Sequence, residues 1–365
     1  MTKIKELITK FGRARMIILV FLVVLLLIAP VFGVSRIASL NDMVIRFTMN
    51  AVLVLSLVPM IQSGCGLNFG IPLGLVAGLL AEAIIWEYKI EGAAGFVAAL
   101  LLGALIGGIF GMFYGILLNR IRGDEMVIAT YVGFAIIYFM NMMWLTLPFQ
   151  NPASVQGYAG EGLRVTISLE DHWLHVFDDW PGEPGKGIVF EIKELLNGEL
   201  TPQYFKVPVG TILLFAFLAF LMWLFFRSKT GTAMTAVGSN PIYARAGGIN
   251  ANYMRLLSVV ISTAVAAMGM IIYGQTYGFA QFYTAPQAFT FPTIAAILLG
   301  GATLTKATIP NVVLGTFLFQ GVLTLTPSVI NSAIDLDMSE VIRMVVTNGL
   351  IVIALTRKGS ENNEK

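Results

Sequence analysis

The chain has 365 residues, of which 57% are hydrophobic and 12% are charged, and its formal net charge is +2. A soluble domain carries about 25% charged residues, so this composition excludes an ordinary soluble fold. The small net charge gives no reason to expect a nucleic-acid partner. The apolar residues come in runs of about 20, the length that crosses a bilayer as a helix. Because lipid offers the backbone no hydrogen-bond partner, we predict an all-α, polytopic integral membrane protein.

About ten candidate spans follow one another along the chain. The first comes after five basic residues and is too long for the apolar part of a signal peptide, so we expect a retained helix. The third and eighth spans are short and broken by glycine and proline. The predicted spans are Met16–Val34, Phe47–Gln62, Leu67–Trp86, Ala93–Leu118, Met126–Leu147, Val207–Phe226, Leu256–Tyr277, Phe289–Leu304, Ile309–Leu325 and Val341–Leu355.

Basic residues indicate the orientation of these spans. With ten spans and an internal N-terminus, 15 of the 23 lysines and arginines fall on the inner side. Inner loops of membrane proteins are enriched in Lys and Arg. We therefore predict a multi-pass protein of the cell membrane, plasma or inner, with both termini in the cytoplasm.

The fourth span carries a glycine at every fourth position, at Gly103, Gly107, Gly111 and Gly115. This spacing places all four on one face of a helix, where a second helix backbone can approach closely. We predict that this face is a tight helix–helix contact, and not a binding site.

One long hydrophilic segment, residues 149–206, interrupts the spans. It is too poor in apolar residues to be a domain of its own, and we predict an extracytoplasmic insert that packs on the helices. Within it we expect Ile188–Leu196 to form a short amphipathic helix. His172 and His175 have a spacing compatible with metal ligation, but the neighbouring acidic residues do not complete a recognisable site, so we predict no metal.

The chain carries no phosphate-binding loop, and the most similar stretch, Pro184–Gly187, lacks the first glycine and the hydroxyl residue. The spans are almost free of ionisable groups, with Glu82 towards the end of the third. Ion-driven carriers place carboxylates or histidines in mid-membrane, so their scarcity argues against an independent carrier. The sequence indicates a path whose energy comes from another subunit.

The most informative stretch is residues 227–255, which we expect to be a cytoplasmic coupling loop. Asn240 is a favoured N-cap, Pro241 suits the first helical position, and Gly247 or Gly248 suits the C-terminal stop. These signals predict a helix of less than two turns that ends at Ala246. We interpret it as a docking element; the alternative is an ordinary ordered loop.

Here the sequence resembles the permease subunits of ATP-binding-cassette (ABC) importers in the branched-chain amino acid, ribose and nucleoside group. The resemblance covers most of the chain outside the insert, and Arg245 departs from it where the family has a small residue. The matching residues are Thr230-Gly231, Ala236, Gly238, Asn240, Ala244, Gly248 and Ile249, the run Thr293–Thr303, Gly315-Thr316, Gly321, the run Gly66–Gly70 and the run Gly123–Thr130.

The resemblance implies a pore made of two permease subunits, homo- or heterodimeric. Two cytoplasmic ATPase subunits would dock on it, and an extracytoplasmic binding protein would deliver solute. It also implies that this chain is not an enzyme and binds no cofactor, since ATP is used by the partner subunit. The residues expected to contact the ATPase are Asn240, Pro241, Ile242, Tyr243, Ala244, Arg245 and Gly248.

The resemblance favours a small polar solute, either a nucleoside or a monosaccharide. Asn50, Asn68, Gln275 and Gln320 are uncharged polar residues that we expect to line the path, together with the broken third and eighth spans. Two alternatives remain at this point: a secondary, ion-coupled carrier and a membrane-embedded transferase. The first lacks coupling groups, and the second lacks a catalytic motif.

Overall fold

The computed structural model describes residues 13–121, 125–151, 154–155, 163–170, 172–182, 187–196, 199–334 and 338–361. The helices are α2 (Arg13–Ile28), η1 (Ala29–Phe32), α3 (Arg36–Leu55), α4 (Val58–Gln62), α5 (Pro72–Glu87), α6 (Gly92–Arg120), α7 (Glu125–Thr146), α8 (Val209–Arg227), α9 (Lys229–Ser239), α10 (Pro241–Ala246), α11 (Ala251–Tyr277), α12 (Ala285–Ala288), α13 (Thr290–Leu299), α14 (Ile309–Ile334) and α15 (Ser339–Glu361). The strands are β1 (Thr166–Ser168), β2 (Ile188–Leu196), β3 (Glu199–Val207) and β4 (Phe279–Gln281).

The prediction of an all-α polytopic membrane protein is confirmed. Within the described residues, seven helical segments are long and apolar enough to cross a membrane. They comprise α2 with η1, α3 with α4, and the single helices α6, α7, α8, α11 and α14. The other three predicted spans fall on the 16-residue α5, on the pair α12 and α13, and on α15. The number ten therefore stays a prediction.

The second span begins earlier than predicted, at Arg36 and not at Phe47. Its first turns carry Arg36, Asn41, Asp42 and Arg46, which a search for apolar runs passes over. The helix continues through them because Ser35 caps it, accepting a hydrogen bond from Ala38 N. At 27 residues, α3 with α4 is about 40 Å long, which exceeds the hydrocarbon layer, so a polar end can protrude.

The glycines of α6 form the predicted tight contact, and their partner is α11. A Cβ added at Gly107 would lie 2.8 Å from Thr263 O, and one at Gly111 would lie 2.9 Å from Val260 Cα. Helix α11 also packs on α3 and α5, so it lies at the centre of the bundle. Small residues let these backbones approach closely, as is common in membrane helices.

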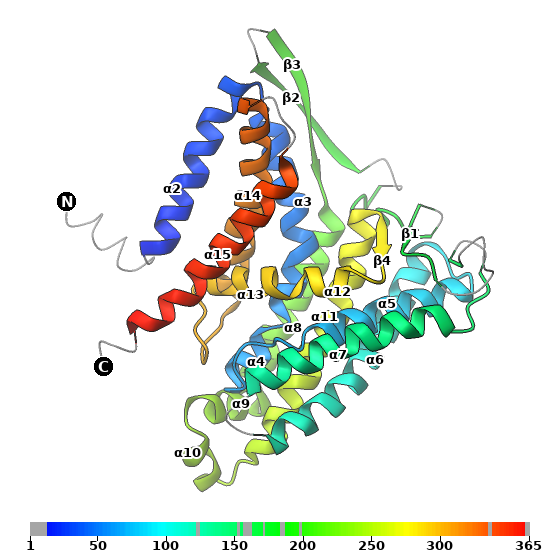
Figure 1. Cartoon of the computed structure of the whole chain (residues 1–365), viewed down its shortest axis with the longest axis vertical. Helices are drawn as coiled ribbons and strands as arrows, with labels where there is room; N and C mark the ends of the chain where they lie inside the picture. The colour runs from blue at the N-terminus through cyan, green and yellow to red at the C-terminus, as the bar shows by residue number, and fades with distance from the viewer. Residues whose placement is uncertain are drawn as a thin grey trace.

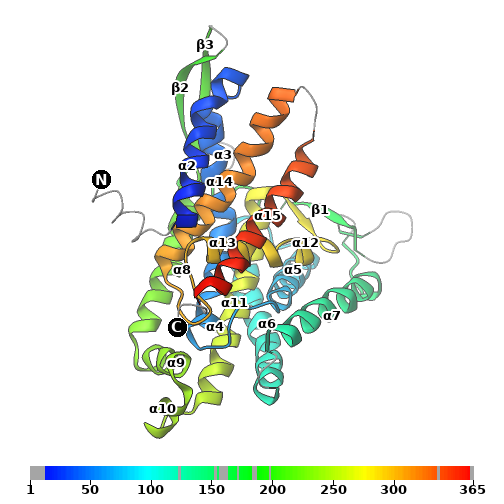
Figure 2. The ribbon, with the colours of Figure 1, turned by 60° about the vertical axis from the view of Figure 1, so that its left-hand side comes forward.

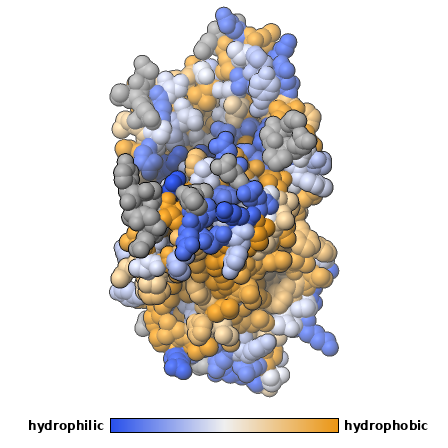
Figure 3. Space-filling view, turned by 90° about the vertical axis from the view of Figure 1, so that its right-hand side faces the viewer, coloured by the Kyte–Doolittle hydropathy of each residue, from blue (hydrophilic) through white to orange (hydrophobic). Residues whose placement is uncertain are grey.

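Figure 1 shows α2, α3, α14 and α15 on one side and α5, α6 and α7 on the other, with α12 and α13 between them. The beginning of α2 and the end of α15 lie on the same side of the molecule, and α9 and α10 project below the bundle (Figures 1 and 2). We call the side with α9 and α10 the α10 side. In the space-filling view, a broad apolar surface lies between hydrophilic regions above and below it (Figure 3).

The insert contains a hairpin, and the prediction of a helix over Ile188–Leu196 is wrong. This segment is strand β2, which pairs antiparallel with β3 in a continuous register from Ile188↔Val207 to Leu196↔Glu199. Its first residues, Ile188, Val189 and Phe190, are β-branched or aromatic and favour strands. The shorter β1 pairs with β4, which joins the insert to the segment after α11.

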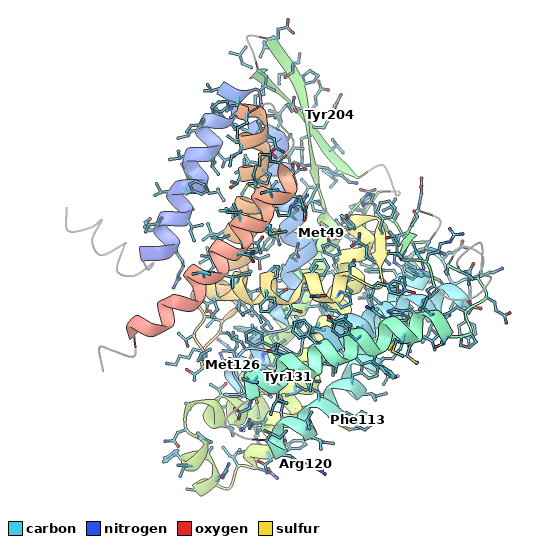
Figure 4. The ribbon with its side chains drawn as sticks, viewed as in Figure 1. Met49, Phe113, Arg120, Met126, Tyr131 and Tyr204 are labelled. Carbon is cyan, nitrogen blue, oxygen red and sulfur yellow. The ribbon has the colours of Figure 1, made fainter. Side chains whose placement is uncertain are left out.

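Two charged contacts hold the hairpin in place, one with the N-terminus of α3 and one with another part of the insert. The Glu194 carboxylate accepts hydrogen bonds from Ser35 Oγ at 2.6 Å and from Arg36 N at 3.1 Å, at the N-terminus of α3. An acidic group is favourable there because the helix dipole is positive at that end. At the other end of the hairpin, Lys206 Nζ lies 2.6 Å from the buried carboxylate of Asp179. The hairpin projects from the bundle on the side away from α10, with Tyr204 directed outwards (Figure 4).

Candidate functional site

The short helix α10 has the ends that the sequence predicts. Asn240 Oδ1 accepts hydrogen bonds from Ile242 N at 3.1 Å and from Tyr243 N at 3.0 Å, so the residue is a true N-cap. Pro241 occupies the first helical position. Gly248 has φ +80°, a left-handed conformation that residues with a Cβ adopt poorly, and it ends the helix.

Helix α10 presents large side chains to its surroundings. Ile242 and Tyr243 are 78% and 79% exposed. Ala244 is buried in a small apolar cluster with Val237 of α9 and Ala251 of α11. The helix is therefore held by one face while its other face is free to contact a partner. Exposed apolar side chains on an ordered, capped element are typical of an interaction site.

The segment before α10, which we expected to be a loop, contains the 11-residue helix α9. Ser228 caps it, accepting a hydrogen bond from Gly231 N at 3.2 Å. Near its other end, Gly238 packs on the backbone of the segment after α4: a Cβ added at Gly64 would lie 3.0 Å from Gly238 Cα. The contact leaves no room for a side chain at Gly238, because Gln62 O occupies that position.

This contact reaches the segments that adjoin the two broken spans. Residues 63–71 connect α4 to α5. Just before them, Gln62 Nε2 donates a 2.5 Å hydrogen bond to Ala307 O, in the segment that follows α13. Ser63 Oγ lies 2.7 Å from Ser258 Oγ of α11. The α10 side thus ties α9, both broken spans and α11 into one set of direct contacts.

A cavity of about 360 Å³ opens among these elements, and we call it the mouth cavity. Both broken spans contribute to it, as does the beginning of α7, where Met126 lies on the side of α9 and α10 (Figure 4). Its lining residues are Gly64, Cys65, Gly66, Glu125, Met126, Val127, Leu304 and Thr305. Beside it, Arg255 Nη2 of α11 lies 2.7 Å from Glu125 Oε1 of α7.

Two further cavities lie along α12 and α13, between α7 and α15 (Figure 1). The one towards α15 measures about 370 Å³ and is lined by Ala288, Phe291, Pro292, Thr347, Asn348 and Ile351. The one towards α7 measures about 10 Å³ and is lined by Phe69, Pro72, Thr130, Gly133, Phe134, Gln287, Thr290 and Phe291. Every polar side chain in both sets is uncharged. The rings of Phe69 and Phe291 meet edge to face at 6.1 Å and so join the two broken spans.

The four residues predicted for the path do not line these three cavities. Asn50 donates to Arg46 O in its own helix at 2.9 Å. Asn68 is buried and donates to Ser262 Oγ at 2.9 Å. Gln320 is 8% exposed, within α14. Their role in a path stays a prediction.

Gln275 belongs to a buried polar cluster that joins the insert to the bundle. Its Oε1 accepts from Phe177 N at 3.1 Å, and its Nε2 donates to Thr211 Oγ1 at 2.9 Å. Asp178 Oδ1 accepts hydrogen bonds from Gln275, Thr276 and Thr211. The amide of Gln275 is thus fully engaged, which favours a structural role.

The amino-acid sequence matches the model of one known protein family over most of its length. Residues 39–355 match the family described as "Branched-chain amino acid transport system / permease component". The chain belongs to this family. It is a permease of the ABC importer type, as the resemblance in its sequence predicted.

Two curated relatives illustrate the range of the family. The nucleoside ABC transporter permease protein NupB of Lactococcus lactis is 23% identical over 262 residues, covering 70% of this chain and 63% of NupB. The autoinducer 2 import system permease protein LsrC of Yersinia pseudotuberculosis is 25% identical over 254 residues, covering 69% of this chain and 60% of LsrC. The matches therefore span 63% and 60% of the length of these relatives, less than two thirds of each. No solved structure gives a significant match.

The broken third and eighth spans of the permease, which the sequence indicated for the path, contribute Phe69, Pro72, Thr290, Phe291 and Pro292 to the α12–α13 cavities, but the sequence missed the polar residues outside these spans. Gln287 and Asn348 lie in segments that read as ordinary short or amphipathic helices, so composition alone does not mark them. What marks these two residues is that each exposes its side-chain amide to the surroundings of the chain, and this exposure can be read only from the structure. Among the described residues, no group of three or more His, Cys, Asp and Glu is suited to a metal. His172 stacks on Trp86, and His175 Nδ1 pairs with Asp178 at 3.0 Å.

Glu82 lies deeper in the structure than the sequence indicated. It is fully buried between α5 and α11, where its Oε1 would lie 3.0 Å from a Cβ added at Gly274. Among the described residues, neither carboxylate oxygen has a hydrogen-bond partner. Burying an unpaired charge is far more costly than burying a neutral polar group.

Proposed function

We propose that this permease forms the translocation path of an ABC importer for a small uncharged solute, a nucleoside or a monosaccharide. An extracytoplasmic binding protein delivers the solute, and a separate cytoplasmic subunit hydrolyses ATP. The observation that carries the proposal is α10. This capped helix exposes Ile242 and Tyr243 and is linked through α9 to both broken spans at the mouth cavity.

The face formed by α12, α13 and the adjoining α7 and α15 supports the path. Asn348 and Gln287 are exposed polar side chains on this face. Polar side chains in membrane segments usually face a bundle interior or a water-filled cavity, because contact with lipid is unfavourable. A second permease subunit that covers this face would enclose the path. The lining has amide and hydroxyl groups but no charge, which suits a neutral solute better than a zwitterionic amino acid.

The relatives agree with this class of solute, since NupB is named for nucleosides and LsrC for autoinducer 2. Uptake into vesicles that contain the assembled importer tests it, with labelled nucleoside, pentose and leucine offered separately. We expect uptake of one of the first two and none of leucine. Uptake of leucine alone would contradict the uncharged path.

The basic-residue distribution supports an orientation in which the α10 side faces the cytoplasm and the insert lies outside. In Figure 1 the beginning of α2 and the end of α15 are both the lower ends of their helices, towards α10, which agrees with an even number of spans. Replacing Lys193, an exposed residue of the insert, by cysteine, in a chain whose Cys65 is changed to serine, tests this orientation. The new thiol should react with an impermeant reagent on intact cells; reaction only after permeabilisation would contradict the proposal.

The ATPase contact is tested by a photo-cross-linker placed at Tyr243. It should capture the ATPase subunit with which the permease is co-expressed. The same cross-linker at Tyr138, which is 61% exposed on α7, provides the control, since α7 is an apolar membrane-spanning helix. Capture from Tyr138 and not from Tyr243 would show that α10 is an ordinary loop. Arg245→Glu should reduce solute-stimulated ATP hydrolysis without preventing membrane insertion, because Arg245 is exposed.

One observation favours the alternative of an ion-coupled carrier, and it is Glu82. A neutral buried carboxyl group that becomes charged when a bundle opens can couple protons to transport. The two functions differ in their energy source. Uptake that persists with a catalytically inactive ATPase subunit and is lost in Glu82→Gln would support the carrier. Uptake that is lost with the inactive ATPase subunit and persists in Glu82→Gln would support the ABC importer.

A further inference from the structure

The ion pair between Glu125 and Arg255 joins two helices that come from distant parts of the sequence. Glu125 is the first residue of α7, and Arg255 lies in the second turn of α11. Their side chains are 2.7 Å apart and only 22% and 15% exposed. A pair shielded from water in this way is screened less than a surface pair, so its partners are held more firmly. Glu125 also lines the mouth cavity.

Arg255 is coupled directly to α10. The chain leaves α10 through Gly248 and enters α11 at Asn250, whose side chain accepts a hydrogen bond from Tyr253 N at 3.1 Å. Ala244 of α10 and Ala251 of α11 share one apolar cluster. Because only a few residues separate the two helices, a displacement of α10 is passed to the first turns of α11 and therefore to Arg255.

The same turns of α11 contact Cys65, a residue that lines the mouth cavity, and its neighbour Ser63. Ser258, one turn after Arg255, lies 2.7 Å from Ser63 Oγ and 3.9 Å from Cys65 Sγ. Cys65 is 4% exposed and lines the cavity. The ion pair thus joins α11 and α7 beside a cavity whose other walls are the two broken spans.

We infer that the Glu125–Arg255 pair limits the width of the mouth cavity and keeps Cys65 covered in this conformation, and that the pair breaks when a partner displaces α10. The inference rests on the proposed function, in which α10 receives the movement of the ATPase. Arg255 and Glu125 are positioning residues: they need not touch solute, and they determine how far α7 and α11 separate. When the pair breaks, α11 can move with α10 while α7 stays, and the segment that carries Cys65 becomes accessible.

Cys65 is the only cysteine of the chain, so it reports this opening without any introduced thiol. The experiment measures the rate at which N-ethylmaleimide labels Cys65 in the purified permease in lipid nanodiscs. We expect Arg255→Gln and Glu125→Gln each to raise the rate about tenfold, which corresponds to about 1.4 kcal/mol in the opening equilibrium. The exchanged pair, Glu125→Arg with Arg255→Glu, should return the rate to within about twofold of the parent.

The control is Arg343→Gln, which removes the partner of Glu340 in an exposed pair at the beginning of α15. It should leave the labelling of Cys65 unchanged. Arg255→Lys keeps the positive charge, so its Cys65 should be labelled at a rate within about threefold of that of the parent. This variant replaces the glutamine variants in the comparison if they do not fold. Parental labelling in both glutamine variants, or failure of the exchanged pair to restore the slow rate, would overturn the inference.

The labelling measurement needs neither solute nor ATPase, so it separates this inference from the proposed function. In the assembled importer, the same glutamine variants should hydrolyse more ATP for each solute molecule transported, because the mouth no longer opens only with α10. If the labelling rates follow the prediction but the assembled importer transports no solute, the proposed function is wrong, while the inference about the Glu125–Arg255 pair holds. If the glutamine variants label Cys65 at the parental rate while the importer is active, the inference about the Glu125–Arg255 pair is wrong and the proposed function holds.

Discussion

The contact between α6 and α11 permits a comparison of two adjacent glycines. Gly107 faces α11, where an added Cβ would lie 2.8 Å from Thr263 O and 3.0 Å from Ala267 Cβ. Gly108 faces a more open region, where the nearest atom, Val260 Cγ1, would be 3.8 Å away. Both are helical residues with the same neighbours in sequence, so Gly107→Ala and Gly108→Ala differ in little except this contact.

In a helix interior, alanine is more favourable than glycine by about 0.5–1 kcal/mol. Gly108→Ala should therefore stabilise the permease by about that amount. At Gly107 the same gain is opposed by overpacking, which costs about 1–3 kcal/mol because the obstructing atoms are backbone and a short side chain. We expect Gly107→Ala to be destabilised by about 1–2 kcal/mol, so the two variants should differ by about 2 kcal/mol.

Thermal unfolding in detergent, followed by intrinsic fluorescence, measures this difference. Gly107→Ala should unfold at a lower temperature than the parent and Gly108→Ala at the same or a higher temperature. If Gly107→Ala is as stable as Gly108→Ala, the two backbones are not in contact at this point. The tight packing of α6 on α11 would then be wrong.

Two further predictions follow from the backbone and from the insert. Gly248→Val should cost about 1–2 kcal/mol in the α10 turn, because φ is +80° there. Solute-stimulated ATP hydrolysis should therefore fall in Gly248→Val. The control variant Gly247→Ala, at a position with φ −80°, should keep the parental rate of hydrolysis. Equal rates of hydrolysis in the two variants would show that position 248 does not need a left-handed conformation. Glu194→Gln should lower the free energy of unfolding by about 1 kcal/mol, since the charge at the N-terminus of α3 is lost. Glu191→Gln, on an exposed residue of the same strand, is the control, and equal melting temperatures would refute that contribution.

The parts of the fold that sequence predicts are those set by local chemistry. Long apolar runs form helices because lipid offers the backbone no hydrogen-bond partner. The spacing of the glycines in α6 places them on one face of the helix, and this holds without knowing which helix packs against that face. The cap of α10 also depends on neighbouring residues only, so Asn240, Pro241 and Gly248 were identified correctly.

The parts that sequence did not predict depend on distant contacts. The early start of α3 depends on the Ser35 cap and is supported by Glu194, which is 158 residues from Arg36. Strand β2 depends on its pairing with β3, which a search for helical periodicity does not detect. Gln275 was selected as a polar residue in an apolar helix, but its amide is engaged by Phe177 and Thr211. A polar residue inside a membrane helix therefore needs its partners identified before it is assigned to a path.

The buried cluster around Asp178 has a mechanical consequence. It fastens the insert to the last turn of α11, while the first turn of α11 adjoins α10 at the opposite side of the bundle. Helix α11 has 27 residues and is about 40 Å long, and its middle is clamped by the glycines of α6. A displacement of the insert therefore acts directly on one end of α11, whose other end adjoins α10.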